Sequence, residues 1–328
     1  MEPIGHVKTK RQLEVAIQAA RKRNTALPHM LFAGAPGCGK TSMARYIAGW
    51  LNVPFLSIVP NDLKDYKAVL RALNQLDHTN YDDRGNRIGP VNPTILFLDE
   101  VHNLPIKGQE LLGLAMERFI IESGRPNKFL WTPLFTLVGA TTMAGKLSKP
   151  FRDRFKLNFT FQPYELEEMK EIVKLHARRN KVLLLPKTIE EIARRSRGTP
   201  RIAVGFVERV RDKMVAVGAA IGTPKITDAV FGDMGIDKEG FTTSELKILK
   251  ALFDAGGKPV GIENLAIITE EDRKTIRDSI EPFLIRKGLV VVSGKGRVLT
   301  ANGVEYVESS GKADKPQKKE IPFDYERD

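Results

Sequence analysis

Residues 34–41 of this chain read GAPGCGKT and fit the phosphate-binding pattern G-x-x-x-x-G-K-[ST] at every fixed position. The segment lies between an apolar, strand-like run at residues 30–33 and a helix-like run that begins near Ser42. Glycines allow backbone N–H groups to point inward at phosphate oxygens, and a helix N-terminus favours negative charge. A plain turn between strand and helix would not need the adjacent lysine and threonine. The pattern therefore predicts a nucleoside triphosphate site at the end of a strand in an α/β domain.

The residues of this loop have separate expected roles. In such loops the lysine, here Lys40, contacts the β and γ phosphate oxygens, and the hydroxyl of the next residue, here Thr41, binds Mg²⁺. Cys38 is the only cysteine of the chain, which excludes an internal disulfide, and its variable position in the pattern favours packing over catalysis. The predicted cofactors are ATP and Mg²⁺. The other predicted nucleotide contacts in this loop are Gly34, Ala35, Pro36, Gly37, Cys38, Gly39 and Ser42.

A second part of the site is expected after the apolar run at residues 95–98, which ends in Asp99 and Glu100. A short apolar run followed by carboxylates is typical of a buried parallel strand that opens onto a site. P-loop hydrolases need one acid that holds Mg²⁺ through its water shell and one that orients the attacking water. We assign the first role to Asp99 and the second to Glu100. His102 follows closely, and a lone histidine after a strand is more often structural.

Composition limits the possible classes of protein. A chain of 328 residues with 42% hydrophobic residues is long enough for two or three domains with ordinary cores. No run is apolar enough for a membrane helix or a signal peptide, so we expect a soluble cytoplasmic protein. The net charge of +12 favours a polyanionic partner such as nucleic acid. Residues 236–310 carry 11 Lys and Arg against 12 Asp and Glu, so DNA contacts there must depend on a few placed side chains.

The order of apolar patterns predicts three folded parts. Strand–helix alternation over residues 1–155 predicts a parallel sheet covered by helices. Residues 156–235 are helical in pattern and predict a small lid domain. Residues 236–308 read as three helices and a β-hairpin, which together indicate a winged helix. The polar residues 309–328 predict a disordered tail.

With these motifs in order, the chain resembles the RuvB family, the hexameric AAA+ ATPases that drive branch migration of Holliday junctions. The resemblance extends from about residue 3 to residue 300. It implies an AAA+ sheet domain, a helical lid and a C-terminal winged helix. The specific feature is the combination of a winged helix with segments 150–155 and 198–201 and with the block formed by 257–265 and 280–288, because clamp loaders and initiator ATPases carry other sequences there. Besides the P-loop, the segments are 99–104 (DEVHNL), 137–145 (LVGATTMAG), 150–155 (PFRDRF), 198–201 (GTPR), 257–265 (GKPVGIENL) and 280–288 (IEPFLIRKG).

The resemblance also implies roles for three further residues. Thr142 matches sensor 1, although on the residues alone a threonine that ends a strand explains it equally well. Arg154 matches an arginine finger that acts in a neighbouring subunit, and Arg152 could take its place. Arg201 matches sensor 2, an arginine of the lid that reaches the phosphates. A cation at a helix N-terminus is otherwise disfavoured, which mildly supports that role.

The nucleotide site departs from the family pattern at the segment that covers the base, whereas the wing tip matches it. The family's segment that closes over adenine corresponds here to the few residues around Ile4, so we expect altered base selectivity. Lys295 and Arg297 match the DNA-contacting tip of the wing, although composition alone favours a solvated turn. The implied partners are duplex or branched DNA, further copies in a hexameric ring, and a RuvA-like protein.

Two segments depart from the family pattern. The hairpin expected to dock on a RuvA-like partner, residues 119–131, is short and differs in composition. Residues 77–90 are longer than the family's equivalent, and we interpret them as a solvated insertion in preference to a new contact loop.

The sequence therefore predicts a ring-forming, DNA-dependent ATPase motor. The main alternative is an ATP-switched loader or remodeller that acts on a protein partner at DNA. A third possibility is a nucleotide-regulated DNA-binding module with little turnover, which Glu100 and Arg154 argue against.

Overall fold

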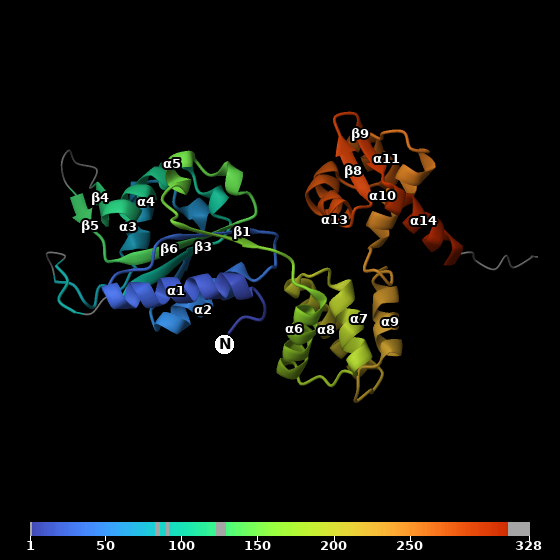
Figure 1. Cartoon of the computed structure of the whole chain (residues 1–328), viewed down its shortest axis with the longest axis horizontal. Coiled ribbons are helices and arrows are strands. Elements are labelled where there is room, and N and C mark those ends of the chain that lie inside the picture. Colours follow the sequence, from blue (N-terminus) through green and yellow to red (C-terminus); the bar gives the residue numbers. More distant parts are fainter. Residues whose placement is uncertain (1, 83–85, 90–91, 123–128, 314–328) are drawn as a thin grey trace, which may run out of the picture. The chain divides into compact units, whose positions relative to one another are not determined.

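The computed structural model describes residues 2–82, 86–89, 92–122 and 129–313. The chain divides into two compact units, Met1–Thr227 and Asp228–Asp328 (Figure 1). None of the helices in the described ranges combines the length and apolar character that crossing a bilayer requires.

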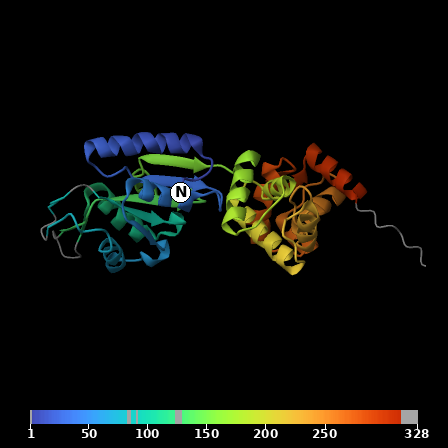
Figure 2. The ribbon, with the colours of Figure 1, turned by 90° about the horizontal axis from the view of Figure 1, so that it is seen from below.

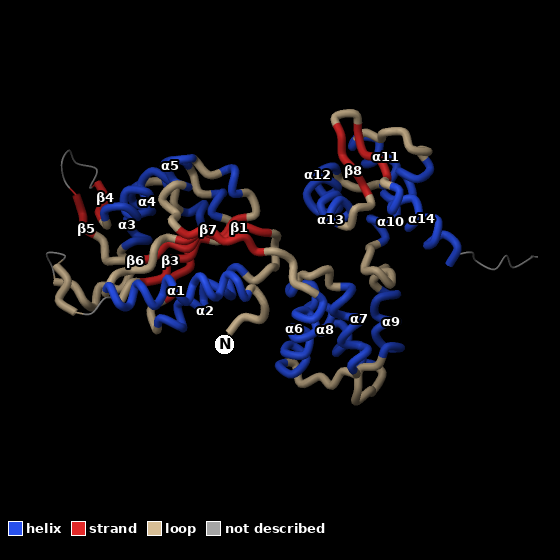
Figure 3. Tube along the Cα trace, in the orientation of Figure 1, coloured by secondary structure: helices blue, strands red, loops and turns tan. Residues whose placement is uncertain are grey.

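The first unit contains a five-stranded parallel sheet in the order β2-β3-β6-β1-β7. Figure 3 shows these strands together in red, with helices around them. Every residue of β3 and β6 is buried, as expected for central strands covered on both faces. The sheet confirms the predicted α/β fold. Its strands are β1 (Met30–Gly34), β2 (Phe55–Ile58), β3 (Thr94–Leu98), β6 (Phe135–Thr141) and β7 (Leu157–Phe161).

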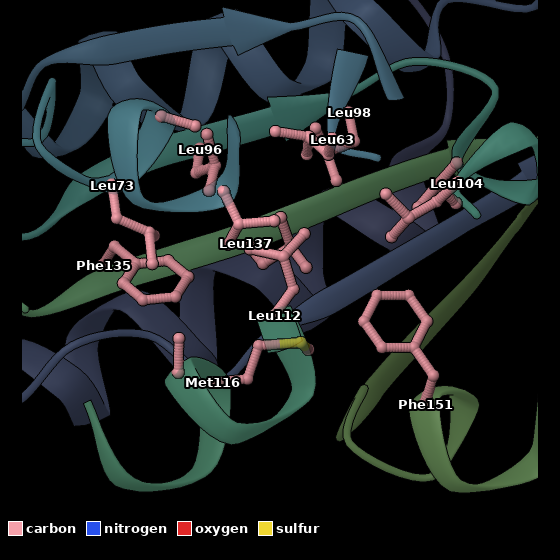
Figure 4. Close-up of a cluster of buried hydrophobic side chains, with 14 of the residues drawn as sticks. Leu63, Leu73, Leu96, Leu98, Leu104, Leu112, Met116, Phe135, Leu137 and Phe151 are labelled. Carbon is pink, nitrogen blue, oxygen red and sulfur yellow. The ribbon is translucent and has the colours of Figure 1, made fainter. Parts of the chain in front are cut away.

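Alternate side chains of the strands enter two separate cores. On β3, Ile95 and Phe97 pack with α1 and α2, whereas Leu96 and Leu98 pack with α3 and α4. The views in Figures 1 and 2 agree that α1 runs along the sheet. Figure 4 shows the second core, where Leu96 lies among side chains of α4 and β6. The helices around the sheet are α1 (Val7–Arg23), α2 (Lys40–Leu51), α3 (Tyr66–Leu73), α4 (Ile106–Arg118) and α5 (Lys149–Arg152).

A helical lid follows β7. Glu165 and Glu168 form a capping box at the start of α6, and prolines occupy the first turns of α7 and α8, where a missing N–H costs nothing. The helices are α6 (Leu166–Arg179), α7 (Pro186–Arg195), α8 (Pro200–Ala216) and α9 (Pro224–Asp233).

The second unit has the predicted helices and hairpin of a winged helix. One difference lies at residues 276–280, where a π-helical turn interrupts the expected continuous helix. Pro282 explains it, because proline has no N–H to donate to the preceding turn. The elements are α10 (Thr243–Asp254), α11 (Ile262–Thr269), α12 (Arg273–Thr275), α13 (Glu281–Arg286), β8 (Val290–Ser293), β9 (Gly296–Leu299) and α14 (Ala301–Ala313).

The first residues of the predicted tail, 309–313, are helical and not disordered. Helix α14 continues to Ala313, so residues 309–313 are helical, while residues 314–328 lie outside the described residues. The helix continues because Tyr306 and Val307 pack against the winged-helix core and hold its preceding turn in place.

Tyr81, in the described part of the insertion at residues 77–90, packs on the pair of strands β4 (Ile120–Glu122) and β5 (Phe129–Trp131). The Tyr81 ring lies 5.3 Å from the Trp131 ring, and its hydroxyl accepts the Leu134 N–H at 3.0 Å. Sequence could not show the Tyr81–Leu134 contact, because the two residues lie 53 positions apart. Thr79, Arg87 and Ile88 of the insertion are exposed, so its interpretation as solvated stays a prediction.

His29 joins three elements of the sheet domain. It directly precedes β1, its Nε2 donates to the Met116 carbonyl of α4 at 2.9 Å, and its Nδ1 accepts the Leu137 N–H of β6 at 2.9 Å. The Leu137 contact requires an unprotonated Nδ1, so the ring is neutral. Burial lowers the pKa of His29 below its ordinary value, with the Met116 hydrogen bond opposing.

Acid should therefore weaken the fold through His29. Below its ordinary pKa of about 6.5, the unfolded chain binds a proton that the folded chain resists, at a cost of at most about 1.4 kcal/mol per pH unit. We expect the melting temperature to fall more steeply from about pH 7.5 to about pH 5.5 in the native protein than in His29→Asn, whose amide oxygen can still accept the Leu137 N–H. Equal slopes in the two proteins would contradict this account.

Candidate nucleotide and DNA sites

Two glycines show why the phosphate loop needs its sequence. Gly37 and Gly39 have φ of 77° and 88°, a conformation that side chains rarely adopt. A Cβ at Gly37 would lie 2.9 Å from Thr199, and one at Gly39 would lie 2.6 Å from the Tyr164 hydroxyl. The loop is thus packed closely against the segment that leads into the lid.

A cavity of about 280 Å³ opens at this loop. It brings together parts of the chain that the sequence analysis assigned to one site. The P-loop contributes one wall, the end of β3 another, and the start of α8 a third. Its lining residues are Pro36, Gly37, Gly39, Lys40, Thr41, Ser42, Asp99, Glu100, Pro200, Arg201 and Val204.

Hydrogen bonds join Lys40, which lines the cavity, to loop residues that do not line it. The Lys40 ammonium donates to the carbonyls of Gly34 and Ala35 at 2.8 and 2.9 Å. Burial lowers the pKa of Lys40, while Glu100 is the largest of the opposing influences. Cys38 is buried, and its carbonyl lies 3.0 Å from Nε2 of His6. Cys38 therefore has a packing role, as its position predicted.

The oxygen donors of the cavity suit Mg²⁺. Thr41 and Asp99 both line it, and Asp99 also accepts the Glu100 N–H at 3.1 Å. In the described ranges, no three His, Cys, Asp or Glu side chains gather as a complete metal site. Magnesium does not require one, because it commonly keeps several waters and binds one or two protein oxygens together with phosphates.

Thr142 lies beside Glu100. Its backbone N–H and hydroxyl both reach Oε2 of Glu100, at 3.2 and 3.1 Å. His102, which the sequence analysis treated as structural, contacts the same oxygen at 3.1 Å through Nδ1. The predicted sensor thus holds the predicted base, and sequence reasoning missed the histidine as its second partner.

Ile4 lines a second cavity of about 150 Å³, which shares Gly39, Ser42 and Pro200 with the first. The N-terminal segment is fastened here by His6, whose ring lies between Phe161 and Tyr164 at 4.7 and 4.6 Å. This cavity beside the phosphate loop, which has both apolar and polar lining residues, has the right position for a base. The remaining lining residues are Glu2, Pro3, Tyr164, Ile172, Leu175 and Arg179.

Arg154 lies away from the phosphate cavity of its own chain and lines a different cavity of about 700 Å³. Its Nη1 donates to the Pro150 carbonyl at 2.6 Å, and its Nη2 lies 3.4 Å from Glu117. Arg152 is exposed nearby. A finger that acts in a neighbouring subunit must lie outside its own site, so the placement is compatible with that role.

The structure contradicts one of the two DNA contacts predicted in the wing, that of Arg297. The Arg297 guanidinium forms a two-pronged ion pair with Glu281 of α13, at 2.5 and 3.1 Å, and the two side chains are only 15% and 7% exposed. Arg297 therefore fastens the wing to the helix and is not free for phosphate. Lys295 remains exposed at the tip.

Two exposed arginines on the helices of the second unit were not predicted as DNA contacts. Arg273 and Arg277 are 63% and 66% exposed, and their nearest carboxylates lie 3.5 and 3.8 Å away. Exposed pairs at such distances are weak, so phosphate can compete for both arginines. The helix-like pattern of residues 272–287 could have identified them.

Family models match the chain in three consecutive parts. Residues 1–161 match the "Holliday junction DNA helicase RuvB P-loop domain", residues 164–237 the "RuvB AAA lid domain", and residues 238–308 the "RuvB C-terminal winged helix domain".

Whole proteins are similar over nearly the same length. The chain is 37% identical to the Holliday junction branch migration complex subunit RuvB of Streptococcus thermophilus, over 93% of this chain and 90% of that protein. It is 39% identical to the subunit of the same name from Helicobacter pylori, over 90% of this chain and 86% of that protein. The solved structure of the Thermotoga maritima RuvB Holliday junction branch migration motor is similar with a TM-score of 0.77 and 33% identity, over 93% and 95%.

The two predicted wing residues should respond differently to substitution. Arg297→Ala leaves Glu281 buried without its partner and should destabilise the protein by ~3 kcal/mol. Lys295→Ala should leave the melting temperature unchanged and lower the salt dependence of DNA binding by about one charge. Melting curves and DNA titrations at several salt concentrations test both. An Arg297→Ala protein of native stability that binds DNA weakly would restore the original assignment.

Proposed function

The chain belongs to the RuvB family, and on that premise we propose that it is a ring-forming, DNA-dependent ATPase motor that translocates duplex DNA and drives branch migration of Holliday junctions. The observation that carries the proposal is a single cavity lined by the P-loop, by both carboxylates after β3 and by an arginine of the lid. We also propose the division into an ATPase domain at 1–155, a lid at 156–235 and a winged helix at 236–308.

ATP with Mg²⁺ is the proposed nucleotide. Lys40 would contact the β and γ phosphates, Thr41 would bind Mg²⁺, and Asp99 would hold its water shell. When bound, Mg²⁺ neutralises charge that develops on the transferred phosphoryl group. Glu100 orients the attacking water, which its place on the cavity wall permits. Ile4 and its neighbours would cover the base.

Arg201 couples the nucleotide to the lid. It lies in the first turn of α8 and lines the phosphate cavity, so an ion pair with the γ phosphate would draw the lid toward the sheet. Loss of that phosphate would release it. A hinge motion of this kind moves whatever follows the lid, which here is the winged helix.

Because Arg154 would act in a neighbouring subunit, each active site would need residues from two adjacent copies. It would reach the γ phosphate of a neighbouring copy and stabilise the charge of the transition state there, so isolated subunits would hydrolyse ATP slowly. A hexamer is the proposed ring, as in the family that the sequence resembles.

A RuvA-like protein is the proposed partner, with duplex or branched DNA as the substrate. The docking surface would be the β4–β5 hairpin together with the insertion that packs on it through Tyr81 and Trp131. The insertion broadens a short hairpin, which supports a contact surface particular to this chain.

The first test is dissociation of a synthetic mobile four-way junction by the purified protein. We expect ATP-dependent dissociation that Lys40→Ala abolishes, because the ammonium can no longer neutralise the phosphates. A fixed, heterologous junction is the matched substrate control, since it offers no migration. DNA-stimulated ATPase activity without dissociation, even with a junction-binding partner present, would favour a loader or remodeller instead.

The finger assignment is tested by mixing two inactive proteins. Arg154→Ala should retain nucleotide binding and lose hydrolysis by ~10³-fold or more. Mixed with Lys40→Ala subunits, it should regain activity, because in a random mixture roughly a quarter of the head-to-tail interfaces pair an intact P-loop with an intact finger. Arg152→Ala is the neighbouring control and should stay active. Absence of recovery in the mixture would refute a role in trans.

A further inference from the structure

The carboxylate of Glu100 is held by three hydrogen-bond contacts on one oxygen. Oε2 lies 3.2 Å from the Thr142 backbone nitrogen, 3.1 Å from the Thr142 hydroxyl and 3.1 Å from Nδ1 of His102. Among the described residues, no hydrogen bond or ion pair engages the other oxygen, Oε1. Because Glu100 lines the phosphate cavity, this oxygen is the one available to a water molecule.

The surroundings of His102 determine which nitrogen carries its proton. An ionised carboxylate only accepts hydrogen bonds, so Nδ1 must donate to it. Nδ1 also lies 2.9 Å from the Thr141 hydroxyl, whose oxygen accepts the Met143 N–H at 2.9 Å. An imidazole without a proton on Nδ1 would direct its lone pair at Oε2, and the two would repel each other. The His102 side chain is 8% exposed, so water cannot replace this contact.

The backbone conformation of Glu100 and the exposure of its side chain indicate why its carboxylate needs partners. Glu100 has φ of 48°, a strained conformation for a residue with a side chain. Its side chain is 37% exposed and would be mobile without partners on the protein side. Thr142 fixes one side of the carboxylate, and His102 fixes the other.

We propose that His102 is a positioning residue, which donates its Nδ1–H to Glu100 and thereby keeps Oε1 directed at the attacking water. The inference rests on the proposed function, because it assigns Glu100 as the base. A base must lie within hydrogen-bond reach of the water it orients, so a carboxylate free to rotate loses rate without losing nucleotide affinity.

Three variants separate this role from simple packing. Asn at position 102 can place its amide nitrogen near the site of Nδ1, whereas Gln places its amide nearer the site of Nε2. We expect His102→Ala to lower kcat at least about tenfold with little change in KM for ATP. His102→Asn should recover most of that loss, and His102→Gln should not. Melting curves and binding of a non-hydrolysable ATP analogue show whether each variant remains folded.

Several results would overturn the proposal. These are an unchanged kcat in His102→Ala, a change confined to KM, a higher rate, or recovery by Gln but not by Asn. The ¹⁵N spectrum of histidine-labelled protein gives an independent answer, because it reports whether His102 carries its proton on Nδ1. A native protein without ATPase activity would refute the proposed function, while the spectrum would still decide the tautomer.

Discussion

The parallel pairing of β3 with β6 is the interaction on which the site depends. Their register sets Leu98 beside Gly139, so the residues that follow each strand emerge at the same edge of the sheet. Glu100 and Thr142 meet there although 42 positions separate them in sequence. Both strands are fully buried, and a shift of this register would cost the packing of two cores. The hydrophobic interior therefore fixes the position of Glu100, the proposed catalytic carboxylate.

Close packing between the phosphate loop and the lid explains how a bound nucleotide can influence the lid. The P-loop begins where β1 ends, and its glycines allow Thr199 and Tyr164 to approach within contact distance. The lid is thus joined to the phosphate loop by close packing and not by a loose linker. A change of charge in the cavity acts on Lys40, Arg201 and the carboxylates together. The structure offers a short path from phosphate chemistry to movement of α8.

The parts of this arrangement that local patterns specify were predictable. The P-loop, the acidic end of β3 and the winged helix depend on residues close in sequence, so their chemistry was apparent without coordinates. Contacts between distant segments were not. Arg297 had the position of a DNA contact, but Glu281 lies 16 residues earlier and becomes its partner only when α13 packs beneath the wing. The contact of His102 with the Thr141 hydroxyl, 39 positions away, and that of Tyr81 with Leu134 were not apparent for the same reason.

Because Arg297 is paired with Glu281, the wing has one cation fewer for DNA phosphates, and this would help a motor to move along the duplex. Each phosphate contact releases counterions and adds to affinity, so a strongly basic wing would hold duplex DNA too tightly to step along it. Residues 236–310 carry almost balanced charge, so their exposed cations, which include Lys295 at the wing tip as well as Arg273 and Arg277, are offset by about as many carboxylates. Contacts of such cations with phosphates would hold the DNA backbone without reading bases and would break readily. In the proposed ring, several copies would supply the total affinity, while each single wing would remain able to let go during its own cycle.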